Sequence, residues 1–234
     1  MQAHCIFDMD GLLIDTESIH IRVNNEILAR YGLTWTEDIK VKMTGTKERD
    51  SATSFVEHYQ PLGVPLTVDQ YQAERKEKVI SRMADCKPLP GVVRLVKHLK
   101  ANNVPIAIAT SSTRFMYNHK AKNNADLFSL FGDHVVCSDD EGIVKGKPHP
   151  DLILAGARSL GQFVSTSDDN SHCLVFEDSE LGAIAGLRAN MRVILVPDEK
   201  AVIDPDVLSK CAKVLKSMED FVPDEFGLPP FPNL

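Results

Sequence analysis

The segment at residues 6–15 constrains this chain most, because an apolar run there leads directly into two aspartates and a glycine. Residues 5–7 predict a short buried strand, and Gly11 allows the backbone to turn immediately after Asp8 and Asp10. Two carboxylates at the carboxyl end of a strand are either solvated turn residues or a reactive pair, in which one attacks as a nucleophile and the other transfers a proton. A divalent cation beside them would offset their mutual repulsion. The choice between these interpretations depends on what the rest of the chain supplies.

Strand and helix patterns alternate from residue 88 onward. Apolar runs of strand length lie at residues 105–109, 134–137, 173–176 and 192–196, and helical patterns separate them. Such alternation is typical of a parallel sheet, because short buried strands need helical crossovers to return in the same direction. Together with the opening strand, the pattern predicts an α/β fold with five parallel strands and helices on both faces of the sheet.

The intervening segment carries helical signals and no clear strand. Apolar residues recur at helical spacing after Ile19, and Thr67–Gln70 resembles a capping box that opens a further helix. We therefore expect two domains, an α/β core formed by residues 1–14 and 88–234 and an inserted helical domain at residues 15–87. An insertion at this point of the chain emerges beside the carboxyl end of the first strand.

Composition narrows the classes of function. The chain has 234 residues, and its net charge of −7 argues against nucleic acid or an anionic membrane surface as a partner. The five cysteines are scattered and contain no Cys-x-x-Cys pair, which indicates neither a disulfide framework nor a zinc site. The chain reaches Asp8 too early for a signal-peptide core, and no apolar run is long enough to cross a bilayer. We expect a cytoplasmic protein that is a monomer or a weak homo-oligomer.

Polar groups follow the second and third predicted strands, as they follow the first. Thr110 and Ser111 come after the second strand, where a hydroxyl and free backbone amides either receive a phosphate oxygen or simply cap the next helix. Lys147 follows the third strand, where a fixed ammonium would neutralise a transferring phosphoryl group. A lysine in a loop is more often solvated, and Lys145 is a rival for the same role.

The fourth predicted strand ends in Glu177 and Asp178, beside an expected helix start. These carboxylates either cap that helix and interact with its dipole or join Asp8 around magnesium, which prefers hard oxygen ligands. Each strand end has an ordinary structural explanation when it is taken alone. Because four of the five predicted strands end in complementary groups, we expect them to form one site at the carboxyl edge of the sheet.

These residues, taken in order, resemble the four motifs of the haloacid dehalogenase superfamily. The motifs are Asp8-Met9-Asp10-Gly11, Thr110-Ser111-Ser112, Lys147-Pro148 and Glu177-Asp178. Residues 6–13, 174–178 and 220–229 further resemble the eukaryotic pseudouridine-5'-phosphatase group within that superfamily. The resemblance spans the whole chain, and it implies a Rossmannoid parallel sheet with an inserted helical cap.

The resemblance also implies a magnesium-dependent phosphomonoester hydrolase that acts through an aspartyl-phosphate. Asp8 would attack phosphorus, and Asp10 would protonate the leaving alcohol and then activate water. Thr110 and the amide of Ser111 would hold phosphoryl oxygens, while Lys147 would stabilise the charge around them. The Mg²⁺ ligands would be Asp8, the backbone carbonyl of Asp10, Asp178 and, directly or through water, Glu177. The expected substrate is a small phosphorylated metabolite, with pseudouridine 5'-phosphate or a related nucleotide ahead of sugar and polyol phosphates.

The inserted helical domain matches the cap of this superfamily, which closes over the core and contacts the leaving group. His20 occupies a position that related sugar-phosphate mutases use, although a histidine on an otherwise apolar helix is more often structural. Residues 45–49 resemble a cap loop that contacts substrate, and Arg49 is the expected contact. The mutases have their arginine three residues after the glycine, where this chain has Glu48, and this departure weakens a mutase interpretation.

Four alternatives accompany the phosphatase prediction. A phosphomutase of the same superfamily would share every core residue and pass the phosphoryl group to a second hydroxyl. A dehalogenase would need only the first aspartate and no metal, so Asp10 and Asp178 argue against it. A receiver-like signalling module would be shorter and uncapped, with its phosphorylated aspartate in the middle of the chain. A phosphate-binding module without turnover is disfavoured because every motif position holds a residue that is competent for catalysis.

Overall fold

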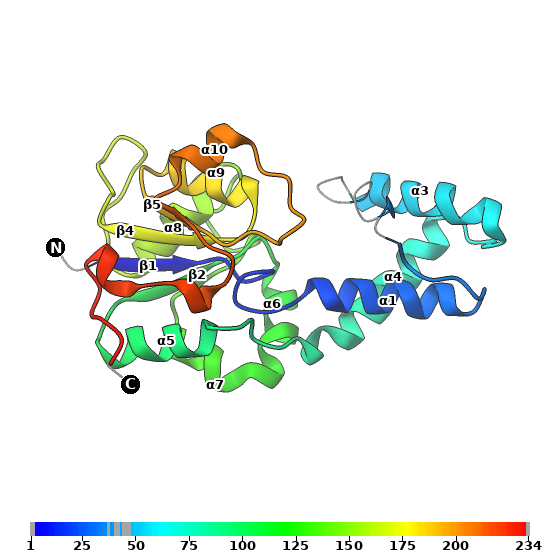
Figure 1. Ribbon diagram of the computed structural model, residues 1–234, viewed down its shortest axis with the longest axis horizontal. Helices are drawn as coiled ribbons and strands as arrows, with labels where there is room; N and C mark the ends of the chain where they lie inside the picture. Colours follow the sequence, from blue (N-terminus) through cyan, green and yellow to red (C-terminus); the bar gives the residue numbers. More distant parts are fainter. Residues whose placement is uncertain (1–2, 37, 40–42, 44–47, 233–234) are drawn as a thin grey trace. The chain divides into compact units, whose positions relative to one another are not determined.

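A computed structural model of the chain describes residues 3–36, 38–39, 43 and 48–232. The chain divides into two compact units, one formed by Met1–Asp15 together with Lys87–Leu234 and the other by Thr16–Cys86. Each junction lies one residue from the domain boundary that the sequence suggests. The two units differ in kind, because the first contains a sheet whereas the described residues of the second form helices and loops (Figure 1).

The first unit is built on a parallel sheet whose strands, among the described residues, follow the order β3-β2-β1-β4-β5-β6. The strands are β1 (His4–Phe7), β2 (Ile106–Ala109), β3 (Val135–Val136), β4 (Cys173–Glu177), β5 (Arg192–Leu195) and β6 (Lys213–Val214). Strand β1 lies between β2 and β4, with Cys5 opposite Ile106 on one side and Leu174 on the other. The strand order reverses beside β1, and the crevice at such a reversal is where open sheets of this kind bind ligands.

Helices cover both faces of this sheet, with α8 and α9 on one side and α5 on the other (Figure 1). The helices of the unit are α5 (Val92–Ala101), α6 (Arg114–Ala121), α7 (Ala125–Phe128), α8 (Asp151–Ser159), α9 (Glu180–Arg188) and α10 (Pro205–Lys210). Since side chains alternate along a strand, Ile6 and Phe7 point to opposite faces. Ile6 belongs to a buried cluster with residues of α8 and α9, while Phe7 stacks on Phe176 with ring centroids 4.5 Å apart. The predicted α/β fold is confirmed.

The edge strand β6 differs from the sequence prediction, which contained five strands. This strand consists of Lys213 and Val214 alone, and both are exposed. It extends the sheet by pairing with β5 in parallel, Lys213 opposite Ile194 and Val214 opposite Leu195. A strand of two exposed residues leaves no apolar run in the sequence, so hydrophobic patterning cannot detect it.

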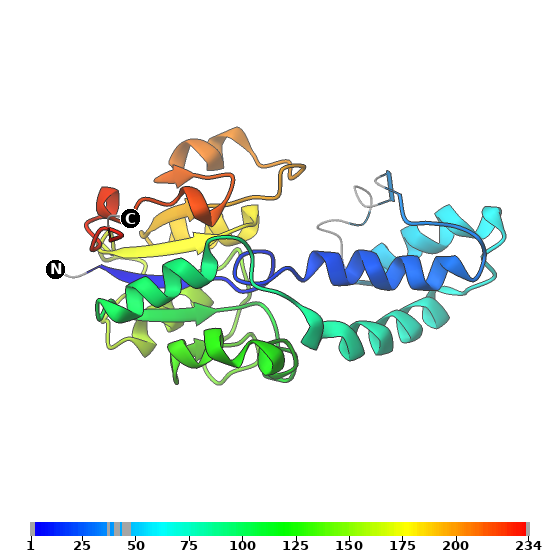
Figure 2. The ribbon, with the colours of Figure 1, turned by 60° about the horizontal axis from the view of Figure 1, so that its bottom comes forward.

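The described residues of the second unit form three α-helices (Figure 2), and their side chains build a core that is rich in aromatic rings. The helices are α1 (Glu17–Ala29), α3 (Glu48–Tyr59) and α4 (Val68–Arg82). Phe55 of α3 stacks on Tyr71 of α4 with ring centroids 3.7 Å apart. The Tyr71 hydroxyl donates to Asn24 Oδ1 at 2.9 Å, and the Tyr59 hydroxyl donates to the Thr34 carbonyl at 3.1 Å. The phenol groups therefore have partners although their rings are buried, which makes these tyrosines compatible with a core.

The predicted capping box at the start of α4 is confirmed. The Thr67 hydroxyl accepts from the Gln70 backbone N–H at 3.2 Å, and Gln70 Oε1 accepts from the Thr67 N–H at 2.9 Å. These reciprocal bonds satisfy two backbone donors at the start of the helix, which begins at Val68. Among the residues that the structure describes, no helix combines the length and the apolar character needed to cross a membrane.

Candidate active site

The segment that follows β1 brings Asp8 and Asp10 to the carboxyl edge of the sheet. The Asp8 N–H donates to the Phe176 carbonyl at 2.9 Å, which continues the pairing of β1 with β4 beyond the end of the strand. Gly11 then adopts a φ of +81°, and a Cβ atom there would lie 2.3 Å from Asp178 Oδ2. Glycine is required at this position both for the backbone conformation and for the close approach of Asp178. The turn thus places the first and fourth predicted motifs in contact.

Lys147 lies between two carboxylates at the centre of the site. Its ammonium donates to Asp8 Oδ1, to Glu177 Oε1 at 2.5 Å and to the Ala109 carbonyl at 3.0 Å, so all three of its protons are used. Its side chain is 6% exposed. Burial by itself lowers the pKa of Lys147, but the charges of Asp8 and Glu177 outweigh burial and raise this pKa above its usual value. The group is therefore a fixed cation.

Lys145, the rival for this role, has a different environment. Its residue is exposed, and its backbone N–H donates to Asp151 Oδ2 at 3.0 Å near the start of α8. The backbone contact stabilises the loop that leads to Lys147. Of the two lysines, Lys147 is the one whose ammonium the structure brings to Asp8.

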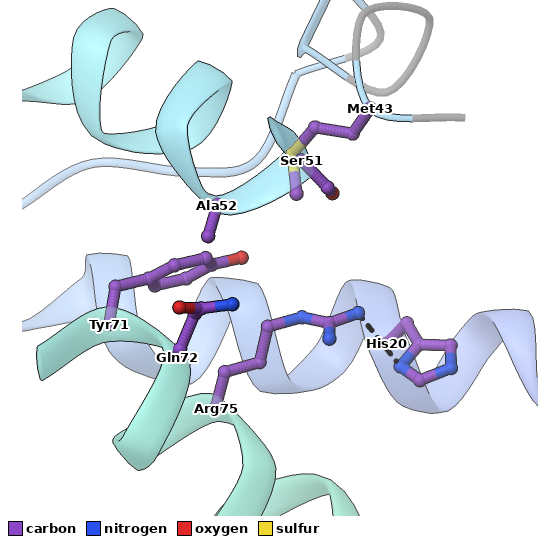
Figure 3. A pocket seen from close by; sticks show the side chains of 7 residues that line it. All are labelled: His20, Met43, Ser51, Ala52, Tyr71, Gln72 and Arg75. Carbon is purple, nitrogen blue, oxygen red and sulfur yellow. Dashed lines mark hydrogen bonds between the residues drawn. The ribbon is translucent and has the colours of Figure 1, made fainter. Parts of the chain in front are cut away.

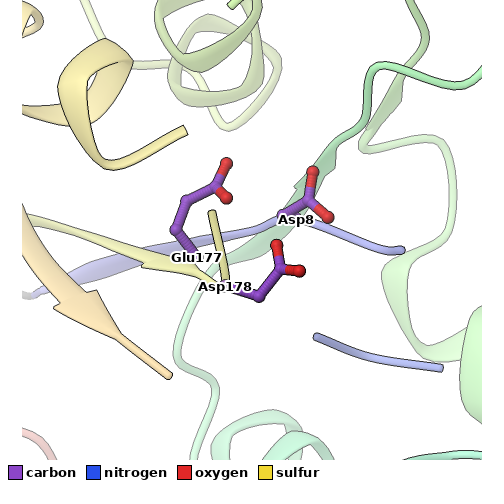
Figure 4. A group of neighbouring side chains, drawn as sticks. All are labelled: Asp8, Glu177 and Asp178. Carbon is purple, nitrogen blue, oxygen red and sulfur yellow. The ribbon is translucent and has the colours of Figure 1, made fainter. Parts of the chain in front are cut away.

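Asp8, Glu177 and Asp178 form an acidic cluster in which one oxygen of each carboxylate lies within 4.8 Å of the others (Figure 4). Burial raises the pKa of Asp8 to about 7, with Glu177 and Asp10 adding to the increase and Lys147 opposing it. Burial and the charges of Asp8 and Glu177 raise the pKa of Asp178 to about 9. Carboxylates held this close together resist ionisation unless a cation offsets their repulsion. Their hard oxygen donors fit Mg²⁺, so the cluster suits the predicted metal.

The Glu177 carboxylate accepts hydrogen bonds from two side chains of the protein. It is fully buried and accepts from Lys147 and, at 3.3 Å, from the Ser179 hydroxyl. A Cβ atom on Gly182, in the first turn of α9, would lie 1.9 Å from Glu177 Cδ. The start of α9 therefore packs directly against this carboxylate, and Gly182 provides the space for it.

The Asp10 carboxylate is bound separately from this cluster. Lys120 Nζ of α6 donates to Asp10 Oδ1 at 2.5 Å, and the Ser112 hydroxyl donates to Asp10 Oδ2 at 2.7 Å. Lys120 also donates to Ser112 Oγ at 2.6 Å. The sequence did not single out Lys120, because a lysine near the end of a short polar helix has the pattern of a solvated residue. The 5% exposure of Lys120 is a property of the tertiary structure alone.

Thr110 and Ser111, the predicted phosphate-binding residues, occupy different positions in the turn after β2. Thr110 is fully buried, its hydroxyl lies 3.5 Å from Asp10 Oδ2, and its oxygen accepts from the Ser112 N–H at 3.0 Å. Ser111 is exposed in the same turn. Asp8, Asp10, Thr110, Lys147, Glu177 and Asp178 thus meet at one sheet edge, with Ser111 at its surface.

His20 of α1 lines a pocket of about 280 Å³ within the helical unit (Figure 3). The other lining residues are Met43, Ser51, Ala52, Tyr71, Gln72 and Arg75. Arg75 Nη2 lies 3.1 Å from His20 Nδ1, and since a guanidinium only donates, Nδ1 is the acceptor. Arg75 Nε is buried and has no hydrogen-bond partner among the described residues. The pocket therefore offers a polar group with unused hydrogen-bonding capacity.

Arg49, the second expected substrate contact, does not line this pocket. Its guanidinium pairs with Asp69 at 2.8 Å, and the two side chains are 68% and 78% exposed. The remainder of the predicted cap loop, Gly45, Thr46 and Lys47, lies outside the described residues. The structure thus places His20 and Arg49 in two different environments of the helical unit.

Comparisons with known proteins agree with the geometry of the sheet edge. Residues 3–190 match the family model described as haloacid dehalogenase-like hydrolase. The chain is 40% identical over 228 residues to the Drosophila melanogaster protein named "Probable pseudouridine-5'-phosphatase", covering 97% of this chain and 95% of that protein. It is 39% identical over 228 residues to the Arabidopsis thaliana "(DL)-glycerol-3-phosphatase 2", covering 97% and 92%.

A solved structure shows the same fold over nearly all of both chains. It is a hydrolase of this family from Deinococcus radiodurans with bound phosphate and sodium, and it superposes with a TM-score of 0.79 at 27% identity, covering 98% of each chain. The family resemblance expected from the four motifs is confirmed.

Proposed function

The chain belongs to the haloacid dehalogenase-like hydrolases and is a phosphomonoester hydrolase for a small phosphorylated metabolite, and we propose that it acts through a magnesium-assisted aspartyl-phosphate on Asp8. The observation that carries this proposal is the buried ammonium of Lys147 between Asp8 and Glu177, with Asp178 beside them. A cation fixed against one particular aspartate, at the carboxyl end of the central strand, suits a nucleophile that receives a dianionic group.

In the first step, a carboxylate oxygen of Asp8 forms a bond to phosphorus while the bond between phosphorus and the alcohol oxygen breaks. Asp10 gives a proton to the departing oxygen. Thr110 and the backbone amide of Ser111 hold phosphoryl oxygens, and Lys147 stabilises the negative charge that the transfer brings beside Asp8. Asp8 acts as an anion although burial raises its pKa to about 7, which makes nearby positive charge essential.

In the second step, Asp10 acts as a base and regains the proton that it gave to the leaving group. A water molecule gives a proton to the Asp10 carboxylate and attacks phosphorus, the bond from phosphorus to Asp8 breaks, and inorganic phosphate leaves. Asp10 is suited to both steps because its carboxylate is separate from the acidic cluster and is held by Ser112 and Lys120.

Bound magnesium would supply positive charge that keeps the carboxylates ionised and neutralises the phosphoryl oxygens. Asp8, Asp178 and the backbone carbonyl of Asp10 are its proposed direct ligands. Glu177 contributes directly or through water, and its existing bonds to Lys147 and Ser179 favour the indirect arrangement. The raised pKa values of Asp8 and Asp178 support this assignment, because a bound cation offsets the repulsion between carboxylates.

The substrate proposal combines the two named relatives with the pocket of the helical unit. We place pseudouridine 5'-phosphate or a related nucleotide first, followed by sugar and polyol phosphates such as glycerol phosphate. His20 and Arg75 offer polar groups for carbonyl and hydroxyl oxygens of the organic part of the substrate. Arg75 Nε, which has no hydrogen-bond partner within the described part of the chain, suits one of these oxygens. Three expectations stay predictions. They are the contact of Arg49 with substrate, the cytoplasmic location, and the monomeric or weakly oligomeric state.

The test is a phosphate-release screen across pseudouridine 5'-phosphate, other nucleotides, pentose and hexose phosphates, and glycerol phosphates, with magnesium titrated for each active compound. We expect one compound to exceed the others and release to require magnesium. A phosphomutase would instead accumulate an isomerised phosphate ester without free phosphate. Full activity of Asp8→Asn, purified away from any wild-type enzyme, would exclude the assigned nucleophile.

A further inference from the structure

The two aspartates of the first motif each have an ammonium of their own. Lys147 binds Asp8, whereas Lys120 binds Asp10, and the two lysines come from different elements of the α/β unit. The side chain of Lys120 is 6% exposed, and that of Asp10 is 29% exposed. A partly exposed aspartate just before a turn can rotate toward solvent, so a second ammonium on this particular carboxylate restricts where it points.

We propose that Lys120 is a positioning residue for the acid/base Asp10, a role that rests on the catalytic function proposed above. Lys120 binds one carboxylate oxygen of Asp10 and Ser112 binds the other, while Lys120 also donates to Ser112 Oγ. Three hydrogen bonds among three side chains fix both torsions of the Asp10 carboxylate. Charge-assisted bonds are the stronger kind, and proton transfer depends steeply on such alignment.

The element that carries Lys120 is itself anchored. Thr113 caps α6 by accepting from the Met116 N–H at 3.3 Å. Arg114 binds Asp140 through Nη2 at 2.5 Å and donates to the Val135 carbonyl at 2.8 Å. The first turn of α6 is thereby tied to β3 and the loop that follows it. Because the first turn of α6 is fixed in this way, Lys120, near the end of the helix, has a defined position beside Asp10.

The hydrogen-bond partners of Lys120 distinguish it from a lysine that only stabilises the fold. Lys120 Nζ has Asp10 and Ser112 as its hydrogen-bond partners in the described part of the chain, and both belong to the site. Helix α6 has its own cap and its own ion pair, so the ammonium is not needed to start it. A buried ammonium is costly unless a carboxylate accompanies it, and the carboxylate chosen here is the acid/base.

The role of Lys120 can be tested by comparing two leaving groups that differ in whether they need a proton from Asp10. An alkoxide such as that of glycerol 3-phosphate leaves only with a proton, whereas p-nitrophenolate leaves without one. Misplacing Asp10 therefore slows formation of the aspartyl-phosphate from glycerol 3-phosphate but not from p-nitrophenyl phosphate. Hydrolysis of the intermediate needs Asp10 as a base for both compounds. A loss of Lys120 that merely disturbed the fold would slow both first steps equally.

The experiment compares Lys120→Met with Lys122→Met, an exposed lysine just beyond α6, in rapid-mixing and steady-state assays on magnesium-loaded enzyme. For Lys120→Met we expect kcat on glycerol 3-phosphate to fall about 10- to 100-fold with KM within about twofold. With p-nitrophenyl phosphate we expect a rapid burst of p-nitrophenol followed by slow turnover. Lys122→Met should match the wild type. Equal slowing of both first steps, or unchanged kinetics of Lys120→Met, would overturn the proposal.

Two further variants keep the test decisive. If Lys120→Met does not fold, as judged by its thermal transition, Ser112→Ala should give the same burst pattern at smaller amplitude, and a uniform loss on both compounds would refute the inference. Asp10→Asn separates this inference from the function on which it rests. Full activity of Asp10→Asn would remove the acid/base assignment itself, whereas an inactive Asp10→Asn beside a normal Lys120→Met would remove only the role of Lys120.

Discussion

The α/β unit and the helical unit differ in how firmly their functional side chains are placed. In the α/β unit, Asp8, Thr110 and Asp178 follow strands that are neighbours in one parallel sheet, so the backbone alone brings them together. In the helical unit, His20 lies in a pocket while Arg49 lies in an exposed ion pair, although both were expected to contact substrate. Sheet register positions the ends of strands, whereas the face of a helix acquires its function from side-chain packing.

This contrast predicts that the largest loss of activity follows from replacing Lys147, the buried cation of the α/β unit. Replacing Lys147 with methionine leaves Asp8 and Glu177 without their buried ammonium, and we expect kcat to fall about 10²- to 10³-fold. Lys145→Met, two residues earlier in an exposed loop, is the matched control and should stay near wild type. Steady-state assays and thermal unfolding of both variants measure the difference. A larger loss in Lys145→Met would reassign the role.

The second effect concerns magnesium. Asp178→Asn removes one charge from the acidic cluster, so we expect at least about a tenfold higher magnesium concentration for half-maximal activity. A magnesium titration of activity and of the thermal transition measures this shift. Asp206→Asn is the control, because Asp206 forms an exposed ion pair with Lys210 and lies outside the cluster. An unchanged titration in Asp178→Asn would remove this residue from the ligand set.

The helical unit should respond through KM rather than kcat. Arg75→Met removes the guanidinium beside His20, and a lost charged hydrogen bond to the leaving group would raise KM about tenfold. Arg82→Met is the control on the same helix, because Arg82 pairs with Glu26 and does not line the pocket. Steady-state kinetics on the best compound of the phosphate-release screen separate KM from kcat. A fall in kcat alone would contradict a binding role for the pocket.

The smallest effect is expected for Arg49. Its pair with Asp69 is exposed, and such pairs contribute about 0–1 kcal/mol to stability. Arg49→Ala should change KM by no more than about twofold and leave the unfolding free energy almost unchanged. Kinetics and denaturant unfolding measure both quantities. A KM increase as large as that of Arg75→Met would place Arg49 at the substrate after all and would narrow the contrast between the two units.

The sequence predicted the elements whose signals are local. The four long strands of the sheet interior appear as apolar runs, and the capping box of Thr67 and Gln70 appears as a four-residue pattern. The features that the sequence did not predict depend instead on contacts between distant parts of the chain. Strand β6 is formed by exposed residues that gain their pairing only from β5, and Lys120 is buried only because α6 carries it to Asp10. No short-range pattern encodes either of them.

By itself, the sequence determined which chemical groups stand at the strand ends, since apolar runs followed by Asp8, Thr110, Lys147 and Asp178 are visible along the chain. Only the tertiary structure decided which ammonium binds which carboxylate. Lys147 and Asp8 are 139 positions apart, and Lys120 and Asp10 are 110 positions apart. The physical reason is that strand formation follows from neighbouring residues, whereas ion pairing depends on how crossovers return to the sheet.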